Sequence, residues 1–437
     1  MRLRWWSVLV LVLPGIAGAS GAVDSIAAHK HLGVASCASS VCHGATQAFK
    51  GSNVMQNEFA LWQEFDPHAT KAWQALTGDK GQAIARKLGL GDATTAKVCL
   101  DCHTDNVASA QRGDKFQLSD GIGCEACHGG AELWISSHAE KVATHADNLG
   151  KGLYETEDPV KRSQLCLSCH MGTTDRMITH RIMGAGHPRL AFELDTFTWL
   201  NPQYKVDDDY LRRKGAWNGV RDWGVGQGVA AANLLDVLLD ERAGWQGIFP
   251  ELVLFDCHAC HKPMSAGRWG PRQGTGLGPG VVRLNDSNLV MFRLLLSVVD
   301  RSAADRVQQQ TRELHQATLR DRAATFAAAR TLRDSVRAAL PGVGSFDFDQ
   351  GALAPILTSV IADAERGEFR DFAAAEQAAM AVQSVVVAFK NAGALDEGRS
   401  TSLQARVDAL YVTVESEDAY LMGPFVTALR AVQAAAR

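Results

Sequence analysis

Several features that would place this chain in a common protein class are missing from it. There is no excess of basic residues, since 44 Lys and Arg face 48 Asp and Glu. Because nucleic-acid binding needs clustered positive charge, the composition excludes nucleic acid as the main partner. After the N-terminus there is also no apolar run of membrane-spanning length, and the most apolar stretch, 289–299, is short and contains Arg293. We therefore expect a buried helix there and no transmembrane segment in the mature chain.

Cysteine, tryptophan and most of the histidines are missing from the last part of the chain. After residue 281 there is no Cys, no Trp and one His, His315, which we expect to be exposed. All ten Cys lie between residues 37 and 260, and the segment 266–280 is rich in Gly and Pro. Such a composition is typical of linkers. We therefore predict a first domain at 23–270, a linker at 271–280 and a second domain at 281–437.

All ten cysteines belong to five copies of one motif. Four copies read C-x-x-C-H, and the first copy has four residues between its cysteines. Zinc sites and disulfide frameworks also pair cysteines, but neither requires His after each second Cys. C-x-x-C-H is the attachment signature of c-type haem, in which the thiols bond to the porphyrin and the His binds iron. We predict five haem c groups, attached through Cys37, Cys42, Cys99, Cys102, Cys124, Cys127, Cys166, Cys169, Cys257 and Cys260, with His43, His103, His128, His170 and His261 as proximal ligands.

The sixth ligand of each iron has to come from another part of the chain. A second imidazole gives a low-potential iron suited to electron transfer, whereas Met raises the potential. We expect Met171, Met177 and Met183 to pack against haem rather than bind iron. The candidate distal ligands are seven of the remaining histidines, namely His68, His138, His187, His180, His145, His31 and His29.

Spacing ranks these candidates. His68 follows Pro67 and is expected at the start of a helix. His138 and His145 are seven residues apart, so we expect them on one helix face, with one of them, preferably His138, as a ligand.

The remaining candidates are placed by their neighbours. His180 and His187 repeat the seven-residue spacing, and the glycines and proline around His187 predict a tight turn that presses it onto a haem. One of His29 and His31 is expected to supply a ligand. His258, inside the fifth motif, is expected to face away from its own iron, and its role stays open.

The two predicted domains differ in what forms their cores. The first has under 250 residues for five haems, so porphyrins must share walls, and we expect short helices, long loops and few strands. A helix is also expected over 225–242. After residue 281, apolar residues recur at helical spacing, for example between Leu319 and Leu340, where Pro341 is expected to end the helix. We predict a mainly α protein, with an antiparallel bundle of four to six helices after the haem domain.

The residues around the second and third motifs resemble those of a known family. The segment 123–130 followed by His138, and Trp62 followed by His68 and Ala69, are similar to the tetrahaem cytochrome c-554 family. The resemblance covers roughly residues 35–190. It implies stacked haem pairs, mostly two His ligands per iron, one iron that can lack a sixth ligand, and His68 and His138 as distal ligands. It also implies electron transfer from hydroxylamine oxidoreductase, although this chain departs in its stretched first motif, fifth haem and added helical region.

The N-terminus predicts export. Two arginines precede an apolar run to Gly18 and a small-residue zone at 19–22, which is typical of a signal peptide; an uncleaved anchor is the alternative. Cleavage leaves 42 basic against 48 acidic residues, an acidic protein expected in the periplasm. Between the fourth and fifth motifs, Arg189, Arg212 and Arg213 belong either to a solvated connector or to a site for haem propionates or an anionic substrate.

Three hypotheses for function follow from these motifs. The first is a pentahaem electron-transfer cytochrome that serves redox protein partners. The second is an oxidoreductase with one open haem iron that acts on a small nitrogen or sulfur compound. The third is a structural subunit, in which the helical domain docks the cytochrome into a complex or dimer. We expect an electron-transfer protein rather than a catalyst.

Overall fold

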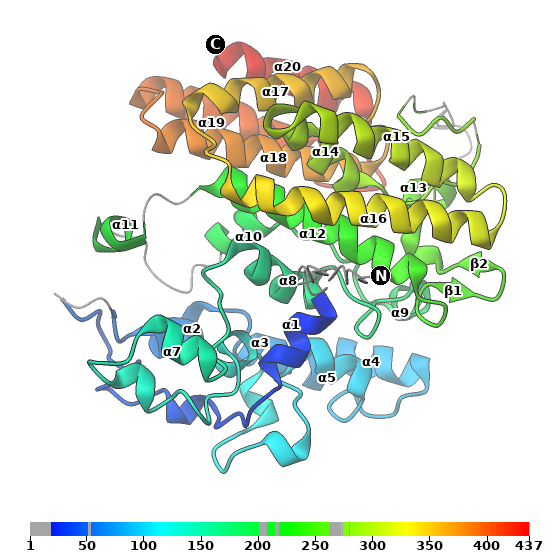
Figure 1. Ribbon diagram of the computed structural model, residues 1–437. Coiled ribbons are helices and arrows are strands. Elements are labelled where there is room, and N and C mark those ends of the chain that lie inside the picture. Colours follow the sequence, from blue (N-terminus) through cyan, green and yellow to red (C-terminus); the bar gives the residue numbers. More distant parts are fainter. Residues whose placement is uncertain are drawn as a thin grey trace, which may run out of the picture.

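The computed structural model describes residues 19–50, 54–200, 208–214, 218–261, 272, 274–278 and 280–436. The predicted signal peptide lies almost entirely outside the described residues, as does part of the predicted linker. Within the described residues the fold is mainly α, as predicted, and its strands form a single two-stranded hairpin. Figure 1 shows two regions, one of short helices below and one of long helices above.

The region that carries the first four motifs consists of short helices joined by long loops. This is the sparse secondary structure expected where a prosthetic group supplies much of the core. The described helices are α1 (Ala19–Ile26), α2 (Glu58–Phe65), α3 (Thr70–Thr77), α4 (Asp79–Leu88), α5 (Lys97–His103), α6 (Glu125–His128), α7 (His145–Gly150), α8 (Pro159–His170), α9 (His180–Ala185), α10 (Leu194–Leu200) and α11 (Asp208–Lys214).

The second region is a helical bundle with one small hairpin beside it. Seven α-helices lie within residues 280–436 instead of the four to six predicted. The elements are α12 (Gly219–Leu239), β1 (Trp245–Gln246), β2 (Phe249–Pro250), α13 (Cys257–Cys260), α14 (Ser287–Val299), α15 (Arg301–Ala317), α16 (Arg322–Ser345), α17 (Gln350–Glu365), α18 (Phe372–Asn391), α19 (Glu397–Val412) and α20 (Met422–Ala436). Pro341 does not end its helix as expected, because α16 continues for one more turn.

Aspartate residues start five consecutive helices of the bundle. Each accepts a hydrogen bond from a backbone N–H in the first turn, which satisfies a donor that the helix itself leaves unpaired. The capping residues of α15 to α19 are Asp300, Asp321, Asp349, Asp371 and Asp396. The repeated caps explain why short loops suffice between long helices here.

Helix α12 lies in the core of the bundle, although it precedes the predicted linker. Trp223, Val225 and Leu235 are fully buried, and the helix packs against α14, α16 and α18. Close approach depends on glycine: a methyl group added at Gly228 would lie 2.6 Å from side-chain atoms of Phe292 and Leu340. The predicted boundary at 271–280 therefore does not coincide with the packing, because a helix that is buried on all sides joins the bundle wherever it lies in sequence.

Helix α18 is the one described helix long and apolar enough to cross a membrane by length and composition. In this structure it is packed inside the bundle, and Ala375, Ala378 and Val382 are fully buried. α14, predicted as a buried apolar helix, packs beside it. The apolar character of both helices is therefore explained by burial in the bundle core.

Candidate haem-binding site

Four of the five motifs lie on short helices. The motif residues end α5, α6 and α8, and they form α13 with His261 directly after it. One helical turn places the two thiols and the following imidazole on the same side of the backbone. The stretched first motif, 37–43, instead follows a 3-10 turn, so its extra residues are accommodated in loop structure.

Four proximal histidines each face a second histidine from a distant part of the chain. An imidazole nitrogen binds a first-row metal at about 2 Å, so two imidazoles on opposite sides of one iron have ring centres roughly 6 Å apart. The observed ring centres are 6.2 Å apart for His43 and His138, and 5.7 Å apart for His68 and His170. They are 6.4 Å apart for His103 and His187, and 6.1 Å apart for His180 and His261. These separations fit an iron between each pair.

The second ring nitrogen of most of these histidines is held by a hydrogen bond. Metal-binding His usually donates its other N–H to a carboxylate or carbonyl, which fixes the ring and its tautomer. The Nδ1 partners are Glu58 for His43 at 3.0 Å, Asp66 for His68 at 3.0 Å, the Ala72 carbonyl for His103 at 3.0 Å, the Ile135 carbonyl for His138 at 2.5 Å, and the Pro188 carbonyl for His187 at 2.8 Å. These bonds leave Nε2 free to bind iron.

The best-defined pair is His68 with His170. Their Nε2 atoms lie 3.5 Å apart, close to the roughly 4 Å expected when one iron separates them. Burial, together with the nearby His68, lowers the pKa of His170 to about 4. A proximal ligand must be neutral to bind metal, so this environment keeps His170 in the required state.

His128, the proximal residue of the third motif, has a different environment. All fourteen histidines lie within the described residues, and none of them forms a ring contact with His128. Burial lowers its pKa, as do the positive charges that His43 and His138 can carry. His128 of the third motif is therefore the one proximal histidine that faces no second imidazole among the described residues.

His29 and His31 were predicted to supply one ligand between them. Both ring nitrogens of the buried His31 are engaged, one with Asp105 at 2.6 Å and the other with the Ile26 carbonyl at 3.0 Å. His29 instead packs on Gly152, near the backbone of the third motif. Of the two histidines, only His29 has ring nitrogens that make no hydrogen bond among the described residues.

Two other histidines, His145 and His315, lie away from the facing pairs. His145 begins α7, whereas His138 belongs to a separate 3-10 turn, so the predicted shared helix face does not form. The half-exposed His145 approaches only Glu157 among the acidic side chains, at 3.5 Å. His315 was expected to be exposed, but it is buried and its Nε2 bonds to Asp286 at 2.9 Å. Sequence could not show this burial, because the Asp286 partner lies 29 residues away.

The cysteines show which motifs are neighbours. The thiols of Cys37 and Cys124 lie close enough for each to shift the pKa of the other, which joins the first motif to the third. Those of Cys102 and Cys169 join the second motif to the fourth in the same way. Cys127 also lies within electrostatic range of the fourth motif. The attachment points of four haems thus form one contiguous group.

Helix α9 connects this group to the fifth motif. It begins with His180, which faces His261, and the turn after it carries His187, which faces His103 of the second motif. The turn uses Gly186 at φ 121°, a backbone conformation that favours glycine. Buried Glu251 accepts a hydrogen bond from the His180 backbone N–H at 2.8 Å and so positions the helix. Sequence analysis did not identify Glu251, Glu58 or Asp66 as residues that orient ligands.

Arg189 contacts residues of the bundle and also lies within electrostatic range of Cys257 in the fifth motif. Its guanidinium pairs with Glu376 at 2.9 Å and with Glu417 at 3.6 Å, and it lies over the Phe372 ring. Arg212 is exposed on α11, and the Arg213 side chain lies outside the described residues. Met171 and Met177 are partly buried and pack against the hydrophobic core.

Comparison with known proteins agrees with the geometry over part of the chain. Residues 36–129 match the family described as cytochrome c554 and c-prime, a segment that holds the first three motifs. No curated protein and no solved structure matches the chain. Through residues 36–129 the chain is similar to the cytochrome c554 and c-prime family, and this match supports a c-type cytochrome with covalently bound haem c that takes part in electron transfer.

Proposed function

We propose that the protein is a periplasmic electron-transfer cytochrome with five haem c groups, four of which have two histidine ligands. The observation that carries the proposal is the set of four facing histidine pairs, each with one partner from a haem motif. When bound, haem c supplies a one-electron iron couple. Each facing pair would hold one haem iron between two imidazoles, which would favour electron transfer over binding of a substrate at iron.

An electron-transfer protein needs its haems to be neighbours, and contacts within the chain bring the haem motifs close to one another. Contacts between Cys37 and Cys124 and between Cys102 and Cys169 bring attachment points together in pairs. Helix α9 then ties the second motif to the fifth through His187 and His180. The order of neighbouring motifs is therefore first, third, fourth, second and fifth, which places the first and fifth motifs at the two ends of the series. Redox protein partners are expected at these ends.

The proposal is tested by the intact mass and by the spin state of the iron. Five haems should add to the mass of the mature polypeptide, and cleavage near Ala22 should define that polypeptide. Electron paramagnetic resonance of the oxidised protein should show low-spin iron for the four paired sites. A mass equal to that of the bare polypeptide, or high-spin iron at most sites, would refute the proposal.

A second candidate function rests on His128. Since no second imidazole faces His128, the third iron is the one that can keep an open position, as an oxidoreductase acting on a small nitrogen or sulfur compound requires. A high-spin signal from one iron that changes on adding such a ligand would favour this function. A purely low-spin spectrum would remove it and would make His29 the sixth ligand to test.

A further inference from the structure

The fifth motif lies where the haem-bearing region meets the helical bundle. Asp256 precedes the motif and caps α13 by accepting a hydrogen bond from the His258 backbone N–H at 3.1 Å. The chain segment that enters the bundle runs back alongside, with Phe255 bridged to Leu284 and the Asp256 N–H bonded to the Arg283 carbonyl at 3.0 Å. The motif therefore has a rigid backbone support on the bundle side.

One arginine joins the caps of two helices at this point. The Arg283 guanidinium lies 2.8 Å from the Asp256 carboxylate and 2.7 Å from that of Asp371. Asp371 in turn caps α18 by accepting from the Ala374 N–H at 2.8 Å. Both carboxylates are about 95% buried and pair with Arg283, and Asp371 also lies 3.5 Å from Arg272. The start of the haem motif and the start of the buried helix α18 are thus held by the same side chain.

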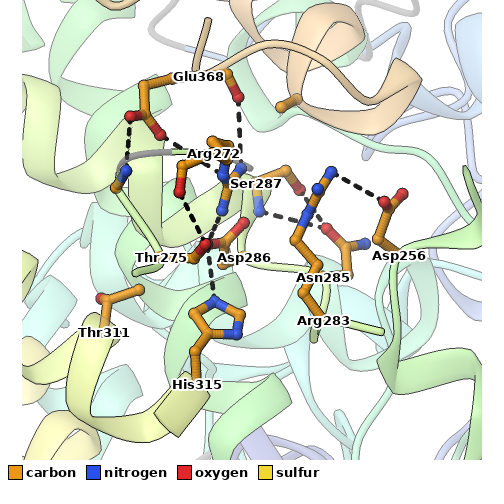
Figure 2. Close-up of polar contacts among 12 residues, drawn as sticks. Asp256, Arg272, Thr275, Arg283, Asn285, Asp286, Ser287, Thr311, His315 and Glu368 are labelled. Atoms are coloured by element: carbon orange, nitrogen blue, oxygen red, sulfur yellow. Dashed lines mark hydrogen bonds and ion pairs between the residues drawn. The ribbon is translucent and has the colours of Figure 1, made fainter. Parts of the chain in front are cut away.

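The ion pairs continue into the bundle as a buried cluster (Figure 2). Arg272, whose side chain is 1% exposed, pairs with Asp286 and lies 3.5 Å from both Glu368 and Asp371. His315 bonds to the same Asp286 from α15. Two carboxylates of the cluster, Asp286 and Asp371, each have two basic partners from different segments of the chain. Arg283 therefore connects the fifth motif to a buried cluster of the bundle and not to an exposed surface.

A second contact acts at the motif itself. The backbone N–H of Phe372, the first residue of α18, donates to Nδ1 of His258 at 3.2 Å. His258 Nε2 lies 3.6 Å from Glu417 of the loop before α20. His258 is 6% exposed and faces the bundle, so this residue of the motif docks on protein and does not bind iron. The open question about His258 is answered by this contact.

We propose that Arg283 is a positioning residue that clamps the fifth haem motif to the helical bundle and thereby sets the reduction potential of that one haem. This inference rests on the proposed function, because it requires haem at the fifth motif. The bundle is then part of the fifth haem site and not a separate appendage. Removing the Arg283 charge makes the surroundings of the motif more negative, because buried Asp371 then keeps only Arg272 as a cationic partner among the described residues, and this stabilises the oxidised iron and lowers its potential.

The test uses the full haem-loaded chain with three variants. Arg283→Gln removes the clamp, and Arg283→Lys keeps the positive charge. Arg337→Gln is the matched control, because it breaks a bundle ion pair with Asp236 that does not contact the fifth motif. Midpoint potentials are measured by optical redox titration, and thermal unfolding is measured in parallel. We expect Arg283→Gln to lower one midpoint, Arg283→Lys to restore it in part, and Arg337→Gln to change none.

Two results would overturn the proposal. One is unchanged midpoints in Arg283→Gln with a loss of thermal stability like that of Arg337→Gln, which would leave only a structural role. The other is a uniform shift of all midpoints. If Arg283→Gln does not fold, His258→Leu removes the second contact and should again move one midpoint only. Failure of the proposed function is distinguished beforehand, because the wild-type intact mass reports whether the fifth haem is attached.

Discussion

Replacing His68 by alanine tests the geometry of the best-defined ligand pair. His68 Nε2 lies 3.5 Å from Nε2 of His170, and the rest of the described histidines are engaged elsewhere or distant from this pair. The variant should therefore leave His170 as the only imidazole on its iron. An iron with a single imidazole ligand becomes high-spin.

The size of the effect follows from the number of motifs. One iron in five changes state, so about one fifth of the total haem should become high-spin while the remainder is unchanged. Stability should also fall, because the Asp66 side chain is 3% exposed and loses the hydrogen bond from the His68 ring at 3.0 Å. Hydrogen bonds to charged groups contribute about 1.5–3 kcal/mol, which bounds the expected loss in the free energy of unfolding.

The assay is electron paramagnetic resonance of the oxidised protein, with haem content measured on the same sample. His145→Ala is the matched control, since the His145 side chain is 53% exposed and faces no other histidine. Free imidazole should restore the low-spin signal in His68→Ala by entering the space left by the side chain. The reasoning would be refuted if His68→Ala kept a fully low-spin spectrum, or if both variants gained the same high-spin signal.

Three further predictions concern other parts of the molecule. Glu58→Gln should raise one midpoint potential in a redox titration, because His43 loses the carboxylate that makes it a stronger donor; unchanged midpoints would contradict this. Gly228→Ala should lower the free energy of unfolding, measured by denaturant titration, by about 1–3 kcal/mol, since its methyl group meets Phe292. Gly342→Ala is the control and should be neutral or slightly stabilising, because its methyl group has no atom within 4 Å. Burial raises the pKa of Asp222 to about 6, so its folded state binds a proton more tightly than its unfolded state. The free energy of unfolding should therefore fall by up to about 3 kcal/mol as pH rises from about 4 to about 6, and Asp222→Asn should remove that part of the slope.

The covalent chemistry and the fold class were predictable because they depend on local patterns. Attachment of haem requires two thiols and an imidazole within five residues, so a motif such as 99–103 is complete in the sequence. The helical periodicity after residue 281 likewise depends on residues three and four apart. The number of helices was underestimated because a break can be a single residue, as where Asp300 alone separates α14 from α15, and leaves little trace in the pattern.

The partners of each iron were not predictable in the same way. His43 and His138 are 95 residues apart, and His68 and His170 are 102 apart, so the sequence offered candidates but could not pair them. For the same reason the ligand role of His31 was left open and the burial of His315 was not predicted. Their acidic partners, Asp105 and Asp286, come from other segments of the chain.

The sequence by itself determined what this protein can bind covalently and that it is mainly helical, because both properties arise within a few neighbouring residues. Only the tertiary structure decided which imidazoles face each other, that α12 belongs to the bundle, and that Arg283 joins the fifth motif to α18. These arrangements depend on burial and charge pairing between segments far apart in the chain. Such pairings are selected by the free energy of the whole fold and leave no local signature in the sequence.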